Sequence, residues 1–169
     1  CIRDSYDASW AQASNTPFRL YKQNQHEGGI SSPLIAHWPA GLKTEAGSIT
    51  RQPAHLIDFM ATFLELGQAE YPKKVNTRII DPLEGRSLVP IFEGEYRKGH
   101  ETLYFHFGSD RALRQGKWKL VSAKGGKWEL YNLDNDRTEL NDLSKKLPHR
   151  VTKMVSEWFD IAKNKERLN

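Results

Sequence analysis

The segment from residue 102 to residue 133 most constrains the fold of this chain. Short runs rich in β-branched, aromatic and leucine residues alternate there with glycine-containing turns, which is typical of an antiparallel sheet. The expected strands cover residues 102–107, 112–114, 118–122 and 128–133. Lys124-Gly125-Gly126-Lys127 fits the hairpin turn between the last two strands, because glycine accepts the positive φ angles that such turns require.

An amphipathic helix is expected after the sheet, over residues 148–165. Its apolar side chains recur at intervals of three or four positions and therefore share one helical face. That face consists of Val151, Met154, Val155, Trp158 and Ile161. We expect it to pack on the sheet, because neither element buries its apolar face alone.

The part of the chain before the sheet predicts fewer regular elements. Polar turns dominate residues 1–31, and the proline-bounded apolar run 33–38 predicts a strand of a buried sheet. Residues 53–66 predict a core-facing helix that starts near Pro53, and residues 88–92 predict a short helix.

The polar N-terminal segment contains a lysine and a histidine four residues apart, Lys22 and His26, directly before Glu27-Gly28-Gly29. A lysine ammonium suits an oxyanion, and a histidine can transfer protons near neutral pH. The glycines allow a tight turn and a close approach of backbone amides to a ligand. We expect Glu27 to orient the loop by accepting backbone hydrogen bonds or by pairing with a cation. Taken alone, these residues also describe an ordinary surface turn.

Ordered sequence matches extend from this loop over most of the chain. Residues 22–39 follow the pattern Lys, four variable residues, Glu-Gly-Gly, then an apolar run ending in Trp-Pro. Further matching segments are residues 55–62, 83–88, 111–120 and 129–139. With these motifs the chain resembles the type I sulfatases, or arylsulfatases.

The resemblance implies the C-terminal part of an α/β, alkaline-phosphatase-like sulfatase fold. A small antiparallel β-sheet packed by a C-terminal helix would be joined to strand and loop remnants of the larger catalytic domain. Residues 1–67 would be the end of the catalytic domain, 68–100 a connecting segment, and 101–169 the C-terminal subdomain. The composition, with 38% hydrophobic residues, suits one small domain with an appended segment.

The nucleophile that type I sulfatases use is expected to lie outside this chain. It is a formylglycine made from cysteine or serine in a Cys/Ser-x-Pro-x-Arg motif, whereas the single cysteine, Cys1, has Arg3 and Ser5 at the proline and arginine positions. The family's calcium ligands also belong to an upstream part. We therefore expect a parent sulfuric ester hydrolase that uses calcium and formylglycine, neither of them bound by residues of this chain, and an inactive fragment.

Five residues are candidates for the site. The resemblance assigns Lys22 to sulfate binding and His26 to contact with the sulfate or the leaving group, although His26 also fits an ordinary loop histidine. His106 stands in a segment whose histidine faces the substrate in the family, and it equally fits a histidine packed among strand aromatics. Asn15 and Arg19 could reach substrate hydroxyl or acid groups, or serve as cap and surface residues.

The formal net charge of +4 favours anionic partners. Acidic and basic residues are interleaved, which favours a solvated mixed-charge surface over a nucleic-acid interface, so no nucleic-acid partner is expected. No apolar run is long enough to cross a membrane. The resemblance implies a sulfate-ester small molecule or a sulfated glycan as substrate, the remainder of the parent chain as partner, and a periplasmic or secreted location.

Two other functions stay open. The missing nucleophile would be explained by a noncatalytic module that binds sulfated or phosphorylated glycans. The basic charge is also compatible with a nucleic-acid binder, whose affinity would fall steeply with salt.

Overall fold

The computed structural model describes residues 7–166, so Cys1, Arg3 and Ser5 lie outside the described residues. The chain forms two compact units. The first combines residues up to Leu34 with those from Glu101 onward, and the second is Ile35–His100. This grouping differs from the expected consecutive segments 1–67, 68–100 and 101–169, because the N-terminal residues belong with the C-terminal sheet.

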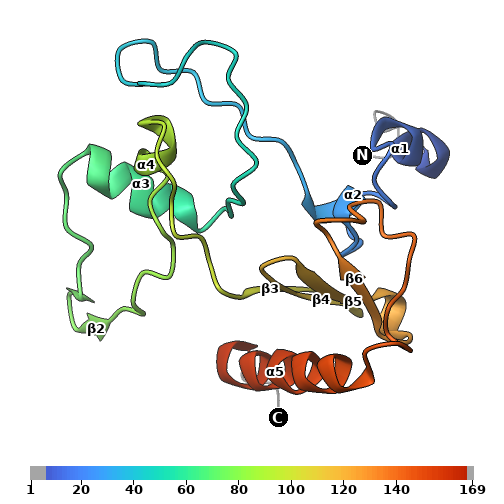
Figure 1. Cartoon of the computed structure of the whole chain (residues 1–169). Coiled ribbons are helices and arrows are strands. Elements are labelled where there is room, and N and C mark those ends of the chain that lie inside the picture. The colour runs from blue at the N-terminus through green and yellow to red at the C-terminus, as the bar shows by residue number, and fades with distance from the viewer. Residues whose placement is uncertain (1–6, 167–169) are drawn as a thin grey trace. The chain divides into compact units, whose positions relative to one another are not determined.

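The first unit is built on a four-stranded antiparallel sheet in the order β3-β4-β5-β6 (Figure 1). Its strands are β3 Leu103–Phe107, β4 Asp110–Gln115, β5 Trp118–Ser122 and β6 Glu129–Asn132. All four expected strands are confirmed. In the turn between β5 and β6, Lys124 and Gly125 have φ angles of 51° and 68°, whereas Gly126 has a φ of −74°. The two residues with positive φ are thus Lys124 and Gly125, whereas the sequence predicted Gly125 and Gly126.

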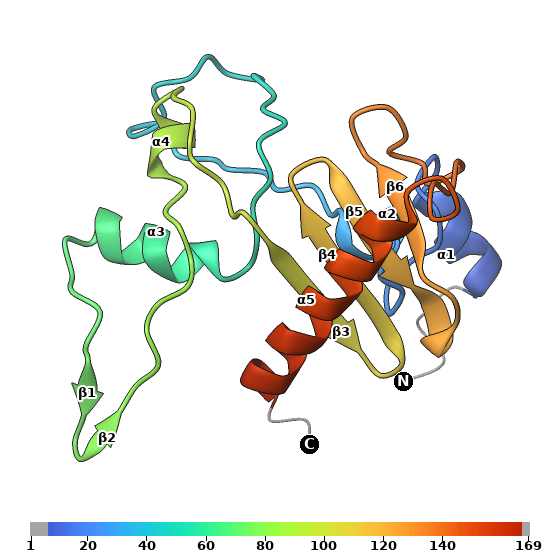
Figure 2. The ribbon, with the colours of Figure 1, turned by 60° about the horizontal axis from the view of Figure 1, so that its bottom comes forward.

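Helix α5, Pro148–Glu166, packs on one face of this sheet (Figure 2). The core between them consists of Leu113, Leu120, Leu130, Met154, Trp158 and Ala162. Val151, Val155 and Ile161 pack against the same core. The expected apolar helical face and its contact with the sheet are therefore confirmed.

The opposite face of the sheet has a second, smaller core. It consists of Ala112, Val121, Tyr131 and Leu133, with Phe105 packed against them. Successive strand residues point to opposite faces, so Lys119 and Val121 point away from Leu120 and α5. The short helix α2, Glu27–Ile30, lies on this side of the sheet (Figure 1).

The N-terminal segment contains two short helices, and the expectation of loop over residues 1–31 was wrong there. Helix α1, Ala8–Ser14, begins after Asp7, whose Oδ1 accepts hydrogen bonds from the amides of Ser9 and Trp10 at 3.0 and 3.1 Å. This is the usual pattern of an N-cap aspartate.

The second unit contains α3 Asp58–Leu66, α4 Val89–Phe92 and a hairpin of β1 Lys74–Val75 with β2 Arg78–Ile79. The expected strand over residues 33–38 is wrong, because this run pairs with no described strand and Ile35 is 88% exposed. Helix α3 begins at Asp58 rather than near Pro53, because the Asp58 carboxylate binds the amide of His55 at 2.8 Å and holds the preceding turn.

Helix α3 was expected to face the core, and the structure contradicts this. Its buried residues are Asp58 and Thr62, whereas Met60 and Phe63 are 52% and 65% exposed. The polar residues are buried because they bind backbone: Thr62 Oγ1 accepts the amide of Leu88 at 2.9 Å. Within the second unit, the apolar side of the helix therefore stays largely exposed.

Candidate functional site

Lys22 lies exposed on a tight turn that ends at α2. The amide of Asn24 donates to the carbonyl of Tyr21 at 3.1 Å, and Gln23 has a φ of 77°. Within residues 7–166, Lys22 makes no hydrogen bond or ion pair. Its ammonium is therefore available to an anion that reaches the turn.

The glycine pair allows this turn to close on itself. The amide of Gly28 donates to the carbonyl of Arg19 at 2.9 Å. A Cβ at Gly28 would lie 2.1 Å from the carbonyl oxygen of Leu20, and one at Gly29 would lie 1.9 Å from that of Asn24. Neither glycine has a positive φ. Glycine is thus required here for close backbone approach, not for an unusual backbone angle.

His26 lies directly before α2 and is fully buried, with 0% exposure. Its Nε2 is 3.2 Å from Oε2 of Glu129 on β6. The same carboxylate oxygen accepts hydrogen bonds from Arg19 Nη1 at 3.1 Å and from the Tyr131 hydroxyl at 2.7 Å. Arg19 and His26 therefore both hold the N-terminal segment to the sheet through Glu129.

Burial and these contacts shift the pKa values of His26 and Glu129. Burial lowers the pKa of His26 below its ordinary value, against the opposing effect of the carboxylates of Glu139 and Glu129. Partial burial opposes ionisation of Glu129, but hydrogen bonds from Tyr131 and His26 and the charge of Arg19 outweigh it and lower the pKa of Glu129. The stable pair near neutral pH is a neutral imidazole beside a carboxylate.

A second contact lies next to the first and is fully buried. Nζ of Lys119 on β5 is 2.9 Å from Oε1 of Glu27 and 2.8 Å from Oε1 of Glu139. Oε2 of Glu139 accepts the backbone amide of Glu27 at 2.7 Å. The expectation that Glu27 pairs with a cation is confirmed.

The remaining candidates lie elsewhere. His106 is on the α5 side of the sheet, where its ring packs at right angles to Trp158 with centroids 5.2 Å apart, so the sheet separates it from Lys22 and His26. This arrangement matches the alternative of a histidine among strand aromatics. Asn15 caps α1, and its Nδ2 donates to the carbonyl of Leu20 at 3.2 Å, as in the alternative capping role.

The second unit has its own buried polar cluster around Asp58, which is 0% exposed. Its Oδ1 accepts from His100 Nε2 at 2.6 Å and from the amide of Arg86 at 2.9 Å, and its Oδ2 is 3.1 Å from Arg97 Nη1. Burial opposes its ionisation, but the hydrogen bonds from the Arg86 amide, His100 and the His55 amide outweigh it and lower the pKa of Asp58. The cluster fixes the start of α3.

Four residues that shape the site were absent from the candidates: Lys119, Glu129, Tyr131 and Glu139. A signal for Lys119 existed, because the strand 118–122 places it on the same face as the apolar Val121. A charge at an inward strand position indicates a buried partner. The partner itself is too distant in sequence to be inferred from one chain.

Comparisons with known proteins agree on one family. Residues 18–164 match the family described as N-sulphoglucosamine sulphohydrolase, C-terminal. An uncharacterized sulfatase of Schizosaccharomyces pombe is 31% identical over 161 residues, or 91% of this chain and 29% of that protein. The steryl-sulfatase of Mus musculus is 34% identical over 110 residues, or 65% of this chain and 16% of that protein.

A solved structure agrees as well. The crystal structure of Ps i-CgsB in complex with k-i-k-neocarrahexaose has a TM-score of 0.70 and 29% identity, over 86% of this chain and 32% of that chain. The chain thus spans a third or less of the length of these relatives. Because the family match covers nearly all described residues, the chain belongs to the sulfatase family and corresponds to its C-terminal region.

Proposed function

We propose that this chain forms one wall of the sulfate-ester site of a sulfuric ester hydrolase, with Lys22 as the cation that binds the sulfate group. The observation that carries the proposal is an exposed lysine with no counter-ion among residues 7–166, on a turn whose two ends are fixed to the sheet through Arg19 and Glu27. The naming of its relatives as sulfatases supports the reaction class.

The chemistry needs a cation at this place. As the S–O bond of a sulfate ester breaks, negative charge grows on the bridging oxygen. A preorganised ammonium stabilises that charge more than it stabilises the ground state. Lys22 meets this requirement because its turn is closed by the hydrogen bond from Gly28 to Arg19.

The role of His26 as a proton donor stays a prediction. A general acid must be protonated at the working pH, whereas burial lowers the pKa of His26. Its contact with Glu129 favours a different contribution, in which the imidazole holds the loop against β6. Arg19 shares that contact, so its proposed reach toward a substrate would require a change of partner.

Calcium and formylglycine are part of the same proposal and would be supplied by the rest of the parent chain. Within residues 7–166, no group of three or more His, Cys, Asp or Glu side chains is arranged to hold a metal ion. These residues do not fit a metal site, and the role of Lys22 is derived without one.

The rest of the parent chain is also the partner that we propose for the apolar side of α3. Leu56, Met60 and Phe63 are 77%, 52% and 65% exposed and recur at helical spacing. Exposed apolar patches usually mark an interface. The aligned part of Ps i-CgsB is 32% of that chain, which leaves ample polypeptide to cover such a patch.

For the substrate we propose a sulfate-ester small molecule or a sulfated glycan, and for the location the periplasm or the cell exterior, as the family resemblance implies. No helix among the described residues is long and apolar enough to cross a membrane. Fractionation of the source cells checks the location.

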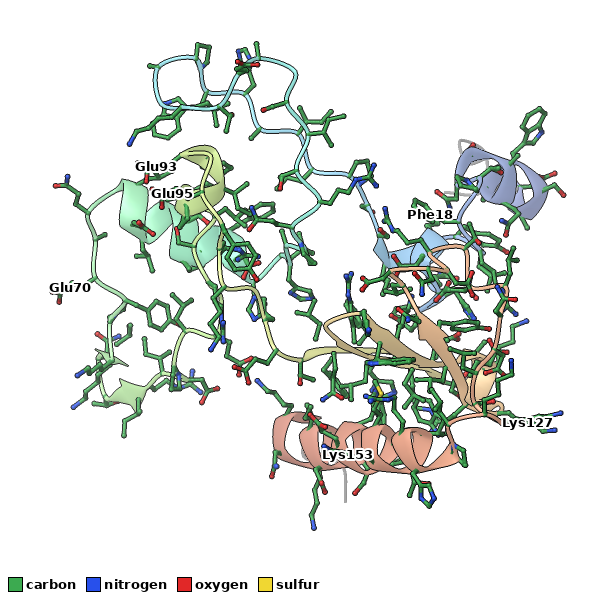
Figure 3. The ribbon with its side chains drawn as sticks, viewed as in Figure 1. Phe18, Glu70, Glu93, Glu95, Lys127 and Lys153 are labelled. Atoms are coloured by element: carbon green, nitrogen blue, oxygen red, sulfur yellow. The ribbon has the colours of Figure 1, made fainter. Side chains whose placement is uncertain are left out.

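The test uses the longer reading frame that contains these residues, assayed with 4-nitrophenyl sulfate in calcium buffer. Lys22→Ala should lower kcat/KM by about 100-fold or more, because one preorganised charge contact is lost. Lys127→Ala is the matched control, since Lys127 is exposed in the turn between β5 and β6 (Figure 3). An unchanged rate in Lys22→Ala would falsify the role of Lys22. Retained binding of sulfated glycans without hydrolysis would favour the noncatalytic module.

A further inference from the structure

We propose that Lys119 is the positioning residue of Lys22: its buried ammonium holds the start of α2 on the sheet and so fixes the turn that presents Lys22. The inference rests on the proposed function and deepens it, because it adds a residue that acts on the sulfate-binding lysine from a distance. Lys119 itself is 0% exposed and reaches no solvent.

The geometry links Lys119 to α2 in a closed ring. Its Nζ contacts Glu27 at 2.9 Å and Glu139 at 2.8 Å, and Glu139 in turn accepts the amide of Glu27 at 2.7 Å. Both the side chain and the backbone of Glu27 are thus held, so β5 and the loop after β6 fix the position of the first residue of α2.

The turn transmits this position to Lys22. The residue after Glu27 donates its amide to Arg19 at 2.9 Å, which ties the end of the turn to its beginning. The spacing between Gly28 and Leu20 leaves no room for even one added carbon. A shift of Glu27 would therefore distort the turn, because Gly28 is bound to Arg19 and Arg19 is itself held by Glu129.

The charge balance makes Lys119 hard to replace. It faces two buried carboxylates, and the other described cation near them, Arg137, is 3.9 Å from Glu27 and partly exposed. Without the ammonium, Glu27 and Glu139 would repel each other in a buried site. Helix α2 would then separate from the sheet.

Hydrogen exchange on this chain tests the positioning without any catalysis. In Lys119→Met, the amides of residues 20–30 should exchange about tenfold faster or more, while those of α5 stay protected. Glu27→Gln is the milder second variant, since it keeps the contact between Lys119 and Glu139, and it should show a smaller effect in the same residues. Lys127→Met removes the same charge at an exposed position and should change nothing. Unchanged exchange of residues 20–30 in both Lys119→Met and Glu27→Gln overturns the proposal.

Kinetics of the longer enzyme with 4-nitrophenyl sulfate test whether the effect passes through Lys22. Lys119→Met alone should lower kcat/KM by about tenfold or more, because a misplaced group loses much of its effect. In the Lys22→Ala background the same change should have little further effect, because no ammonium is left to misplace. Equal losses in both backgrounds would show a merely structural role and refute the inference. If Lys22→Ala alone leaves the rate unchanged, the proposed function fails, and the exchange result still decides on Lys119.

Discussion

Nζ of Lys119 lies 2.9 Å from Oε1 of Glu27 although the two residues are 92 positions apart in sequence. The contact joins β5 to the first residue of α2 and is inaccessible to solvent. It ties the segment that carries Lys22 to the C-terminal sheet. In the motif Lys, four residues, Glu-Gly-Gly, the lysine (Lys22) is thus exposed, whereas the glutamate (Glu27) is buried and attaches the segment to the sheet.

Lys22→Ala should leave stability nearly unchanged. Lys22 is exposed and makes no hydrogen bond or ion pair with the described residues, so its loss should alter the free energy of unfolding by no more than about 0.5 kcal/mol. Urea unfolding followed by circular dichroism measures this. A loss of several kcal/mol would mean that Lys22 supports the fold rather than a ligand.

Removing the Asp58 carboxylate should unfold the second unit selectively. Asp58→Ala leaves the charge of Arg97 buried without its carboxylate partner, and breaking such an ion pair costs about 3–5 kcal/mol. Limited proteolysis should then cut within residues 35–100 well before it cuts the sheet of the first unit. Glu65→Ala, at an exposed position of the same helix, is the control. Equal resistance of both variants would contradict the prediction.

Trp158 should contribute much of the stability of the first unit. It is 2% exposed and packs against Tyr104 and Trp128 with ring centroids 5.2 and 5.9 Å away. Trp158→Ala should lower the free energy of unfolding by about 3–5 kcal/mol through lost burial and a cavity. Trp10→Ala, at a position that is 67% exposed, should have almost no effect. Chemical denaturation read by circular dichroism compares the two variants without relying on tryptophan fluorescence.

Stability should fall as the pH drops below about 6.5, in part because of His26. Its folded-state pKa is lowered by burial, so the unfolded chain binds a proton that the folded chain resists. The stabilisation is complete above the ordinary histidine pKa and is lost as the pH falls toward the folded-state pKa. His55, whose pKa burial also lowers, acts in the same direction, so His26→Gln should reduce the slope without abolishing it.

Urea unfolding at pH 7.5, 6.5 and 5.5 measures that slope. His149→Gln, an exposed histidine of α5, is the control and should keep it. The lowered pKa of Glu129 acts at more acidic pH, below the ordinary carboxyl value, and does not confuse the comparison. An unchanged slope in His26→Gln would show that the imidazole is hydrated in solution.

The apolar side of α3 should make the isolated chain associate. Phe63→Ser removes a side chain that is 65% exposed and stacked on Phe59, and it should reduce self-association in sedimentation velocity. In the longer enzyme the same change should lower stability, because the patch would be covered there. Tyr96→Ser, at an 84% exposed position, is the control. A monomeric wild-type chain at high concentration would argue against an unsatisfied interface.

The sheet and α5 were predictable because their signals are local. Strands 118–122 and 128–133 alternate over a few residues, and the stripe around Trp158 repeats at the helical period. The strand predicted over residues 33–38 was wrong because a strand needs a neighbouring strand to pair with, and an apolar sequence does not show whether one is present. The prediction of a core-facing α3 failed for a related reason. Its apolar residues do recur at helical spacing, but the described residues bury the polar side around Asp58 instead.

The candidate site was predictable only in part. Lys22 is exposed, which is compatible with the predicted binding of an anion from outside the chain. The burial of His26 depends on Glu129, 103 residues further along the chain, and no local pattern reveals such a pair. His106 was ambiguous because alternation places it on one face of the sheet without saying which face is covered by α5.

The grouping of residues up to Leu34 with those from Glu101 onward sets an order of events during synthesis. When the turn around Lys22 leaves the ribosome, neither Lys119 nor Glu139 has been made, and the whole of Ile35–His100 must emerge first. Until then, Glu27 in the nascent chain lacks its contacts with Lys119 and Glu139. A chain stalled before β5 would therefore expose Lys22 on a segment that has not yet docked on the sheet, so that the turn reaches its final conformation only after β5 and Glu139 have been synthesised.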